Sequence, residues 1–381
     1  MRLSTKLIHA GEPHPRIEGA VAMPIFQSST FEFSGGPGTS YHDVRYIRLN
    51  NTPNHVALSQ KLSALEETED ALVTASGMAA VSAALMSLLR TGDHVLANDC
   101  LYGGTVSLLD DDLAAVGIGT SYVDGNDPAS WKRHLTPSTK VFYVEAITNP
   151  LMQVIDLDAV VEFARTHSLV TIIDSTMATP INFRPATRGF DLVVHSATKY
   201  LNGHSDLVAG VVAGKRDLVA RAKKKLDHLG GTLDPHTCFL LHRGLKTLGV
   251  RMRHQNESAL RIARFLAAHP AVAAVNHPWL ETSAGHARAR TLFTGGGGML
   301  SFRPKGGAQA ADAFTRGVRL AISAPSLGGP ETLVTRPTTT SHVGVPVAQR
   351  EKLGITDDLV RVSIGLEDPE DLEADFAQAL A

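Results

Sequence analysis

One lysine follows a strand-like run and two hydroxyl side chains, and together these groups could do chemistry on an aldehyde. The apolar run 192–194 is followed by Ser196 and Thr198, immediately before Lys199. The hydroxyls can donate to a phosphate, and a partly desolvated lysine beside another cation readily loses the proton that prevents it from forming a Schiff base. This pattern is typical of a pyridoxal 5′-phosphate (PLP) site. The alternative is a solvated surface lysine, because most lysines are exposed.

A carboxylate at the end of another strand-like run is the second candidate. Asp174 ends the apolar run 169–173, and open α/β sheets bind ligands beyond the carboxyl ends of their strands. A carboxylate beside the pyridine nitrogen keeps the nitrogen protonated, which makes the cofactor an electron sink. An aspartate that only caps the next turn is the alternative.

Upstream, a turn of small residues opens an Ala- and Leu-rich helical pattern at 77–89. Ser76 is a good N-cap, and the free N–H groups of Gly77 and Met78 would face an anion. Tyr102 follows the strand-like run 94–97 and could stack on a planar cofactor. An ordinary helix start and an ordinary core or surface tyrosine are the alternatives.

Taken in order, these pieces resemble the Cys/Met-metabolism (trans-sulfuration) family of PLP enzymes: cystathionine γ-synthase, cystathionine γ-lyase, cystathionine β-lyase and methionine γ-lyase. The resemblance covers nearly the whole chain. It is carried by the segments PIFQSSTF (24–31), SGMAA (76–80), YGGT (102–105), SATKYLNGH (196–204), RGLKTL (243–248), SLGG (326–329) and LVRVSIGLED (359–368).

The resemblance implies roles for individual residues. Lys199 corresponds to the Schiff-base lysine that also moves protons, and Tyr102 to the ring that stacks on the cofactor and assists deprotonation. Asp174 corresponds to the partner of the pyridine nitrogen. The implied phosphate cradle is Gly77, Met78, Ser196 and Thr198, joined by Tyr46 and Arg48 from the neighbouring subunit. The residues implied to hold the substrate carboxylate are Asn149, Ser326 and Arg361. Asn149 is also implied to lie near the cofactor hydroxyl.

The resemblance also implies an α/β fold of fold type I, like that of aspartate aminotransferase, with a mostly parallel sheet and a smaller C-terminal α+β domain. Apolar runs that alternate with helical patterns favour the same sheet. We expect an N-terminal arm at 1–50 that contacts a neighbouring subunit, a PLP-binding domain at 51–243 and a small domain at 244–381. Active sites shared between subunits of a homotetramer, a dimer of dimers, follow from the same resemblance. The expected strands lie at 71–73, 94–97, 140–144, 170–173, 192–194 and 208–213, and a helix is expected from 245 to about 269.

Composition agrees with such an enzyme. The 381 residues carry a formal net charge of −2, so we expect neither nucleic acid nor an anionic membrane as partner. Cys100 and Cys238 are too few for a disulfide framework. The first ten residues lack a signal-peptide core, and no segment is apolar and long enough to span a bilayer. We therefore expect a cytoplasmic protein.

Two features could suggest other sites. The glycine run 295–298 precedes the strand-like residues 299–302 and not a helix, so a turn is the better interpretation than a nucleotide loop. The 17 histidines show no helical zinc spacing, and we predict no metal site.

The substrate is less constrained than the cofactor. Cystathionine enzymes tend to have Glu where Pro325 stands and Arg where Ser107 stands, and methionine γ-lyases commonly have Cys in place of Gly104. The usual Asn-Pro-Thr and Asp-Asn-Thr segments are Asn-Thr-Pro at 51–53 and Asp-Ser-Thr at 174–176 here. We therefore hypothesise a substrate with a smaller or uncharged distal group.

The predicted activity is elimination from the β- or γ-carbon of a sulfur amino acid such as cystathionine or a related substrate. Two alternatives stay open: γ-replacement on an activated homoserine, and a PLP-fold regulatory subunit without catalysis.

Overall fold

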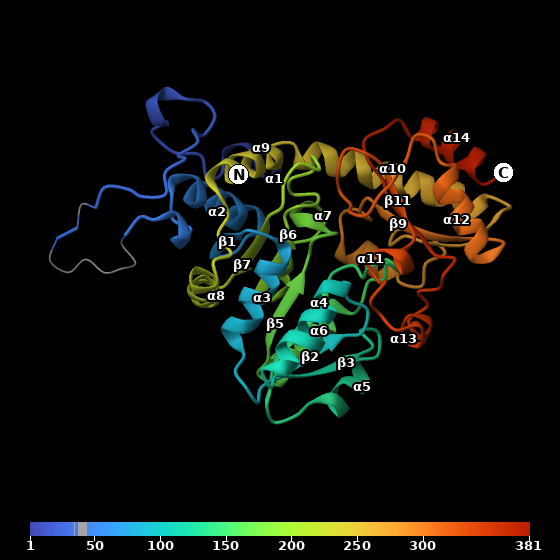
Figure 1. Ribbon diagram of the computed structural model, residues 1–381, viewed down its shortest axis with the longest axis horizontal. Coiled ribbons are helices and arrows are strands. Elements are labelled where there is room, and N and C mark those ends of the chain that lie inside the picture. The colour runs from blue at the N-terminus through green and yellow to red at the C-terminus, as the bar shows by residue number, and fades with distance from the viewer. Residues whose placement is uncertain (34, 37–43) are drawn as a thin grey trace.

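The larger part of the molecule is built on a seven-stranded sheet (Figure 1). The computed structural model describes residues 1–33, 35–36 and 44–381. The strand order is β1-β7-β6-β5-β4-β2-β3, and every neighbouring pair except those of β7 is parallel. The strands are β1 (Asp70–Thr74), β2 (His94–Asn98), β3 (Gly119–Val123), β4 (Thr139–Glu145), β5 (Val170–Asp174), β6 (Leu192–Ser196) and β7 (Gly210–Gly214).

The antiparallel β7 follows from its connection. Residues 197–209 join β6 to β7 without a helix, whereas a parallel neighbour is usually reached through a crossover helix. The sequence missed β3, because this edge strand is Gly-Thr-Ser-Tyr-Val and only Val123 is buried.

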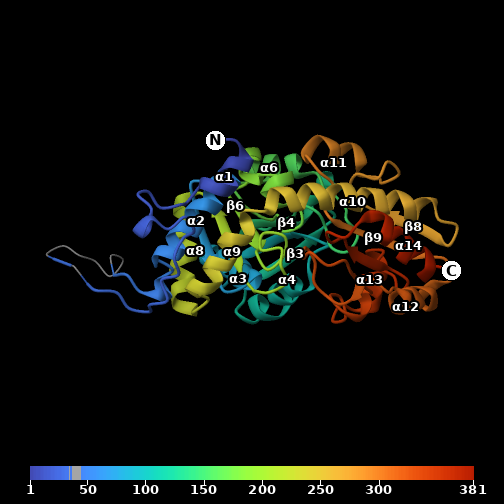
Figure 2. The same cartoon turned by 90° about the horizontal axis from the view of Figure 1, so that it is seen from above.

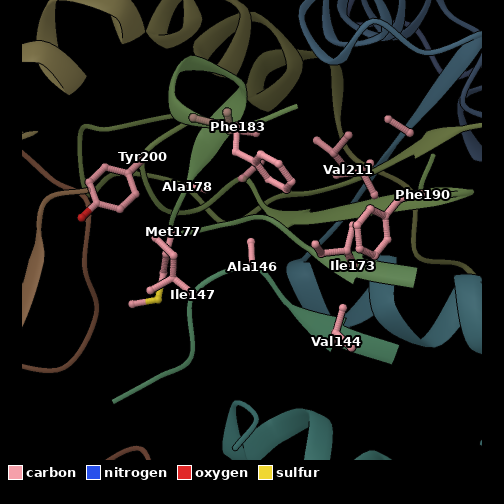
Figure 3. Packing of buried hydrophobic residues seen from close by; sticks show 14 of the residues in the cluster. Val144, Ala146, Ile147, Ile173, Met177, Ala178, Phe183, Phe190, Tyr200 and Val211 are labelled. Carbon is pink, nitrogen blue, oxygen red and sulfur yellow. The ribbon is translucent and has the colours of Figure 1, made fainter. Parts of the chain in front are cut away.

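Helices cover both faces of this sheet. One face packs against α3 (Gly77–Leu88), α8 (Arg216–Leu229) and the π-helix Leu108–Leu113 that continues α4 (Gly103–Ser107). The other face packs against α2 (Pro53–Glu66), α6 (Leu157–Thr166) and α9 (Pro235–Leu245). Figure 3 shows this second face, where Ile173, Phe190 and Val211 meet. The short helices α5 (Pro128–Trp131), α7 (Thr179–Asn182) and α11 (His286–Leu292) also contribute apolar residues to the core on this second face.

The C-terminal part carries its own sheet, in the order β10-β11-β12-β9-β8. Only β10 and β11 are parallel neighbours. Its apolar residues pack with those of α10 (Leu248–Ala268), α12 (Gly307–Gly317) and α14 (Pro369–Ala379). The predicted fold class, a mostly parallel sheet with a smaller C-terminal α+β part, is therefore confirmed. The strands are β8 (Val272–Asn276), β9 (Met299–Pro304), β10 (Ile322–Ser323), β11 (Leu333–Thr335) and β12 (Val360–Ser363), and α13 (Val347–Lys352) lies before β12.

Two local predictions compare directly with these elements. The glycine run 295–298 is a loop that leads into β9, as expected. The helix expected from residue 245 begins three residues later as α10. Thr247 interrupts it by donating its hydroxyl to the carbonyl of Gly244, 3.1 Å away, a local bond that competes with helix continuation.

The N-terminal segment begins with α1 (Leu3–His9), which packs on α2. The buried Lys61 on α2 donates to the carbonyls of Leu7 (2.9 Å) and Ile8 (3.3 Å). Beyond α1, the described residues up to 33 extend away from the sheet, as both views in Figures 1 and 2 show. The boundaries 1–50, 51–243 and 244–381 stay predictions. Within the described residues, no helix combines the length and the apolar character that a membrane span requires.

Candidate active site

A cavity of about 680 Å³ lies between the carboxyl ends of the central strands and the C-terminal part. Its lining comes from the ends of β4, β5 and β6, the start of α3, and the segments around residues 326, 340 and 361. The sequence had placed ligand groups at this edge of a parallel sheet. The predicted site residues that line it are Gly77, Met78, Tyr102, Asn149, Asp174, Ser196, Thr198, Lys199, Ser326 and Arg361.

Two predicted residues do not line this cavity. Tyr46 precedes the 3-10 turn Ile47–Leu49, and the Arg48 guanidinium lies 5.6 Å from the centre of the Tyr46 ring. Arg48 Nη1 also donates to the carbonyl of Asp227 on α8, 3.0 Å away. The prediction that both residues reach a neighbouring subunit concerns a second chain and stays a prediction.

Lys199 follows β6 and points across the cavity to the C-terminal part. Its Nζ donates to Ser326 Oγ at 2.9 Å. Burial, together with the positive charge of Arg361, lowers the pKa of Lys199 to about 8. A sizeable share of the lysine is therefore neutral near physiological pH, as a nucleophilic amine requires.

Arg361 on β12 is a buried cation. Its Nη1 donates to Asn149 Oδ1 (3.2 Å) and its Nη2 to the Ser326 carbonyl (3.0 Å). Burial lowers its pKa to about 10, so the guanidinium stays charged at neutral pH. Among the described residues, no carboxylate forms an ion pair with it. Because a buried charge is costly without a counterion, this fork is suited to an anion that enters the cavity.

The loop that carries Ser326 is tightly constrained. Ser326 has a φ of 101°, a backbone conformation that residues other than glycine rarely adopt. Gly328, with a φ of 79°, leaves no space for a side chain, because a Cβ there would lie 2.6 Å from the backbone nitrogen of Tyr200. The backbone N–H of Gly328 donates to Ser363 Oγ at 2.9 Å. This loop is therefore held directly against the residue that follows Lys199.

Asp174 is a buried carboxylate at the end of β5. Its Oδ1 accepts from the backbone N–H of Thr176 at 2.8 Å. Burial raises the pKa of Asp174, while hydrogen bonds from the Thr176 hydroxyl and N–H and the charge of His195 lower it. A buried carboxylate in the cavity wall can form a charge-assisted hydrogen bond with a protonated ring nitrogen.

The start of α3 forms a cradle that a larger residue at position 77 would fill. Ser76 is the N-cap, as predicted, because its Oγ accepts from the N–H of Ala79 at 3.0 Å. A Cβ on Gly77 would lie 2.7 Å from the Ser196 Cβ, so only glycine allows the helix to approach the end of β6 this closely. The N-terminus of α3 and the Ser196 hydroxyl thus face the same space, which fits a phosphate group.

Thr198 and Tyr102 complete the cavity wall. The Thr198 hydroxyl exchanges hydrogen bonds with Ala209, accepting from its N–H at 3.1 Å and donating to its carbonyl at 3.2 Å. The side chain of Tyr102 is 44% exposed, and its ring lies against Gly104, where a Cβ would come within 2.6 Å of the ring. A partly exposed ring at the edge of a cavity can stack on a planar ligand.

Sequence reasoning missed several residues that shape the cavity. Glu145 lies opposite Asp174 in the register of β4 and β5, and its Oε1 accepts from the N–H of Tyr102 at 2.6 Å. Burial, followed by the charge of Asp174, raises the pKa of Glu145 well above its ordinary value. Its place at the end of a buried strand was a signal that could have found it. Thr340 and Ser341 also line the cavity, but they lie in a loop with no periodic pattern.

The fold and this site define a PLP-dependent enzyme of fold type I. A model of the family described as Cys/Met metabolism PLP-dependent enzymes matches residues 4–381, and the chain belongs to that family.

Similar proteins agree with this assignment. Cystathionine gamma-lyase of Bacillus subtilis is 40% identical, over 100% of this chain and 99% of that protein. L-methionine gamma-lyase of Fusobacterium nucleatum subsp. polymorphum is 39% identical, over 99% of this chain and 98% of that protein. The crystal structure of cystathionine gamma-lyase from Lactobacillus plantarum complexed with L-serine superposes with a TM-score of 0.94 at 34% identity, covering 100% of this chain and 98% of that one.

Proposed function

We propose that the protein is a PLP-dependent carbon–sulfur lyase that eliminates the sulfur substituent from the β- or γ-carbon of an amino acid. The observation that carries the proposal is the pairing of Lys199, with a pKa of about 8, and the charged Arg361 in one cavity. The relatives' names, which include both cystathionine and methionine lyases, support the substrate class.

PLP, when bound, supplies an electron-withdrawing ring that accepts the electrons released when the substrate α-carbon loses its proton. The residues that would hold it are those of the α3 cradle with Ser196 and Thr198, Asp174 at the ring nitrogen, and Tyr102 on the ring face. Lys199 would attach to the cofactor aldehyde.

Lys199 is also placed to move protons. A neutral Nζ would accept a proton from a substrate carbon, and the resulting ammonium would return that proton elsewhere on the substrate. The Ser326 hydroxyl, 2.9 Å from Nζ, keeps the amine oriented toward the substrate side of the cavity. β-Elimination requires one such removal, whereas γ-elimination requires a second removal from the β-carbon.

Arg361, Asn149 and Ser326 would hold the substrate carboxylate. Asn149 Oδ1 and the Ser326 carbonyl already fix the guanidinium from one side. The fork therefore does not have to be ordered when the substrate arrives, which reduces the entropic cost of binding.

The wall around the distal end of the substrate favours a neutral group. Pro325, Val208, Thr340 and Ser341 line the cavity, and none of them is charged. Ser107, on α4, does not line it. The two charge-assisted contacts that a distal amino acid group needs, worth about 1.5–3 kcal/mol each, are absent from the described cavity wall. We therefore favour a substrate with a small or uncharged distal group.

The test is the identity of the keto acid released from L-cystathionine, L-methionine, L-cysteine and L-homocysteine by the purified enzyme with PLP. We expect 2-oxobutyrate or pyruvate, with a higher kcat/KM for the substrates with neutral distal groups than for cystathionine. Pro325→Glu should shift the preference toward cystathionine, and Pro325→Ala is its matched control.

Other outcomes point to the alternatives. Turnover only when an activated homoserine and a thiol are supplied together would assign γ-replacement. Bound PLP without any turnover would contradict the proposal and favour a regulatory subunit. The complete set of cavity residues and the enzyme family argue against such a subunit.

We also propose a cytoplasmic homotetramer, a dimer of dimers with shared active sites. The arm at 1–50 exposes apolar side chains, with Val21 77% and Phe33 59% exposed, which suits contact with a second chain. Both cysteines are free and buried, consistent with a reducing compartment. Co-expressing Lys199→Ala with Arg48→Ala tests the sharing, because a hybrid dimer contains one intact site only if Arg48 acts across the interface.

A further inference from the structure

A buried pair of ionisable side chains lies behind the strand that leads to Lys199. His195 on β6 and Glu66, the last residue of α2, are 0% and 1% exposed, and His195 Nε2 lies 2.6 Å from Glu66 Oε1. Among the described residues, His195 Nδ1 and Glu66 Oε2 have no hydrogen-bond partner. Neither residue lines the cavity, and none of the roles above requires them.

The pair and the cavity lie on opposite faces of the sheet. Side chains alternate along a strand, and Val193 belongs to the core on the α2 side whereas Val194 belongs to the core on the α3 side. His195 therefore faces α2, and Ser196 faces the cavity. Val194 is also the β6 partner of Asp174. His195 is the residue after Val194, so its imidazole lies close to Asp174 along the strand but on the opposite face of the sheet.

The arrangement orients the pair toward Asp174. The imidazole belongs to the strand beside β5, whereas the carboxylate belongs to the helix layer beyond it. A buried carboxylate is costly without a counterion, and an imidazole at hydrogen-bond distance provides that counterion when it carries a second proton. The positive end of the pair then faces the sheet, and its negative end lies on α2.

We propose that Glu66 and His195 are positioning residues that keep Asp174 ionised from behind the sheet. This inference rests on the role proposed for Asp174 beside the cofactor ring nitrogen. Burial opposes that ionised state, because it raises the pKa of Asp174 above its ordinary value. The groups that face Asp174 are Glu145 and Tyr143 from β4, the Thr176 hydroxyl and N–H after β5, His195 from β6, and Lys199 in the shared cavity.

The test is the pH dependence of the PLP dissociation constant, measured on apoenzyme by the absorbance of bound PLP. Glu66→Gln keeps the shape of the side chain but removes the charge that holds the proton on His195. The loss of a nearby positive charge raises the pKa of Asp174. PLP binding should weaken at low pH (the acid limb of its profile), and we expect the pH at which this weakening begins to rise by about one unit. Below that pH the variant should bind PLP about tenfold more weakly than the parent protein. His195→Gln should do the same, and the double variant should add little.

Two buried residues away from the cavity provide matched controls. Glu12→Gln removes a buried carboxylate that lies 2.8 Å from Lys246 Nζ. His94→Gln replaces a buried strand histidine bonded to Thr139 and Ser121. Both should lower the melting temperature and leave the PLP binding profile unchanged. A wild-type binding profile in Glu66→Gln, with only a lower melting temperature, would show that the pair is structural and overturn the inference.

Asp174→Asn separates this inference from the proposed site. If Asp174→Asn leaves the acid limb unchanged, the role of Asp174 itself fails. If it removes the limb while the Glu66 and His195 variants do not move it, only the inference fails. If those variants do not fold, ¹⁵N-histidine NMR of the unaltered holoenzyme provides the test. We expect one buried, slowly exchanging imidazole with both nitrogens protonated. A spectrum without such an imidazole would contradict the proposal.

Discussion

Replacing Arg361 by lysine tests the proposed substrate site most directly. The guanidinium is 4% exposed, fixed by Asn149 and the Ser326 carbonyl, and has no acidic partner in the described part of the chain. Lysine keeps the charge but replaces a planar fork by a single ammonium, which cannot bind a carboxylate in a bidentate manner.

The expected loss can be worked out from one hydrogen bond to a charged group. Such a bond contributes about 1.5–3 kcal/mol, so Arg361→Lys should lower kcat/KM by about 10- to 150-fold. Arg361→Leu should cost more, because the charge is lost as well. It should also raise the pKa of Lys199, since the positive charge of Arg361 lowers that pKa. The acid limb of kcat/KM should therefore move to higher pH in the leucine variant and stay in place in the lysine variant.

The assay is the steady-state release of keto acid from the best substrate over a range of pH, with PLP affinity measured in parallel. Arg303→Lys is the matched control. Arg303 lies on β9, beside β12, and forms a partly exposed ion pair with Asp358 at 2.9 Å, which contributes at most about 1 kcal/mol. A kcat/KM within threefold of the parent in Arg361→Lys, with an unshifted acid limb in Arg361→Leu, would refute the reasoning.

Three further predictions concern single residues. Lys199→Ala should abolish turnover and the visible absorbance of bound PLP, and turnover near the parent rate would contradict its role. Gly77→Ala should weaken PLP binding at least tenfold in an equilibrium titration, because its Cβ would lie 2.7 Å from the Ser196 Cβ; unchanged affinity would exclude a tight cradle. Burial lowers the folded-state pKa of Lys61 to about 8, so the unfolded chain binds more protons between about pH 8 and 10, and stability should rise there by about 1.4 kcal/mol per pH unit. Urea titrations at several pH values should show that the unfolding free energy rises less per pH unit in Lys61→Met than in the parent protein.

The parts of the fold that follow from local patterns were predictable. Buried parallel strands such as β4 and β5 are continuous apolar runs, and Ser76 has the side chain that an N-cap requires. The polar edge strand β3 was missed because its residues do not repeat in an apolar pattern. The antiparallel direction of β7 depends on the path of a connection, which residue types do not specify.

The site was predictable to the extent that motifs carry it. Lys199, Asp174 and Gly77 lie in contiguous segments with recognisable chemistry, and the structure brings them to one cavity. Glu145 could have been found at the end of its buried strand, whereas Thr340 and Ser341 enter through tertiary contacts between distant segments. The pairing of Glu66 with His195 joins residues 129 positions apart, and no local pattern encodes such a contact.

The close approach of Gly328 to Tyr200 bears on how the enzyme matures. The loop around Ser326 rests on the backbone beside Lys199, and the guanidinium of Arg361 comes from β12, far along the chain from Lys199. Contacts between such distant segments form slowly, because long loops must close first. The central sheet, which pairs segments closer in the chain, can thus form before the C-terminal wall of the cavity. The groups that would hold PLP can therefore come together before the groups that would hold the substrate carboxylate, so that cofactor binding and substrate recognition mature at different stages of folding.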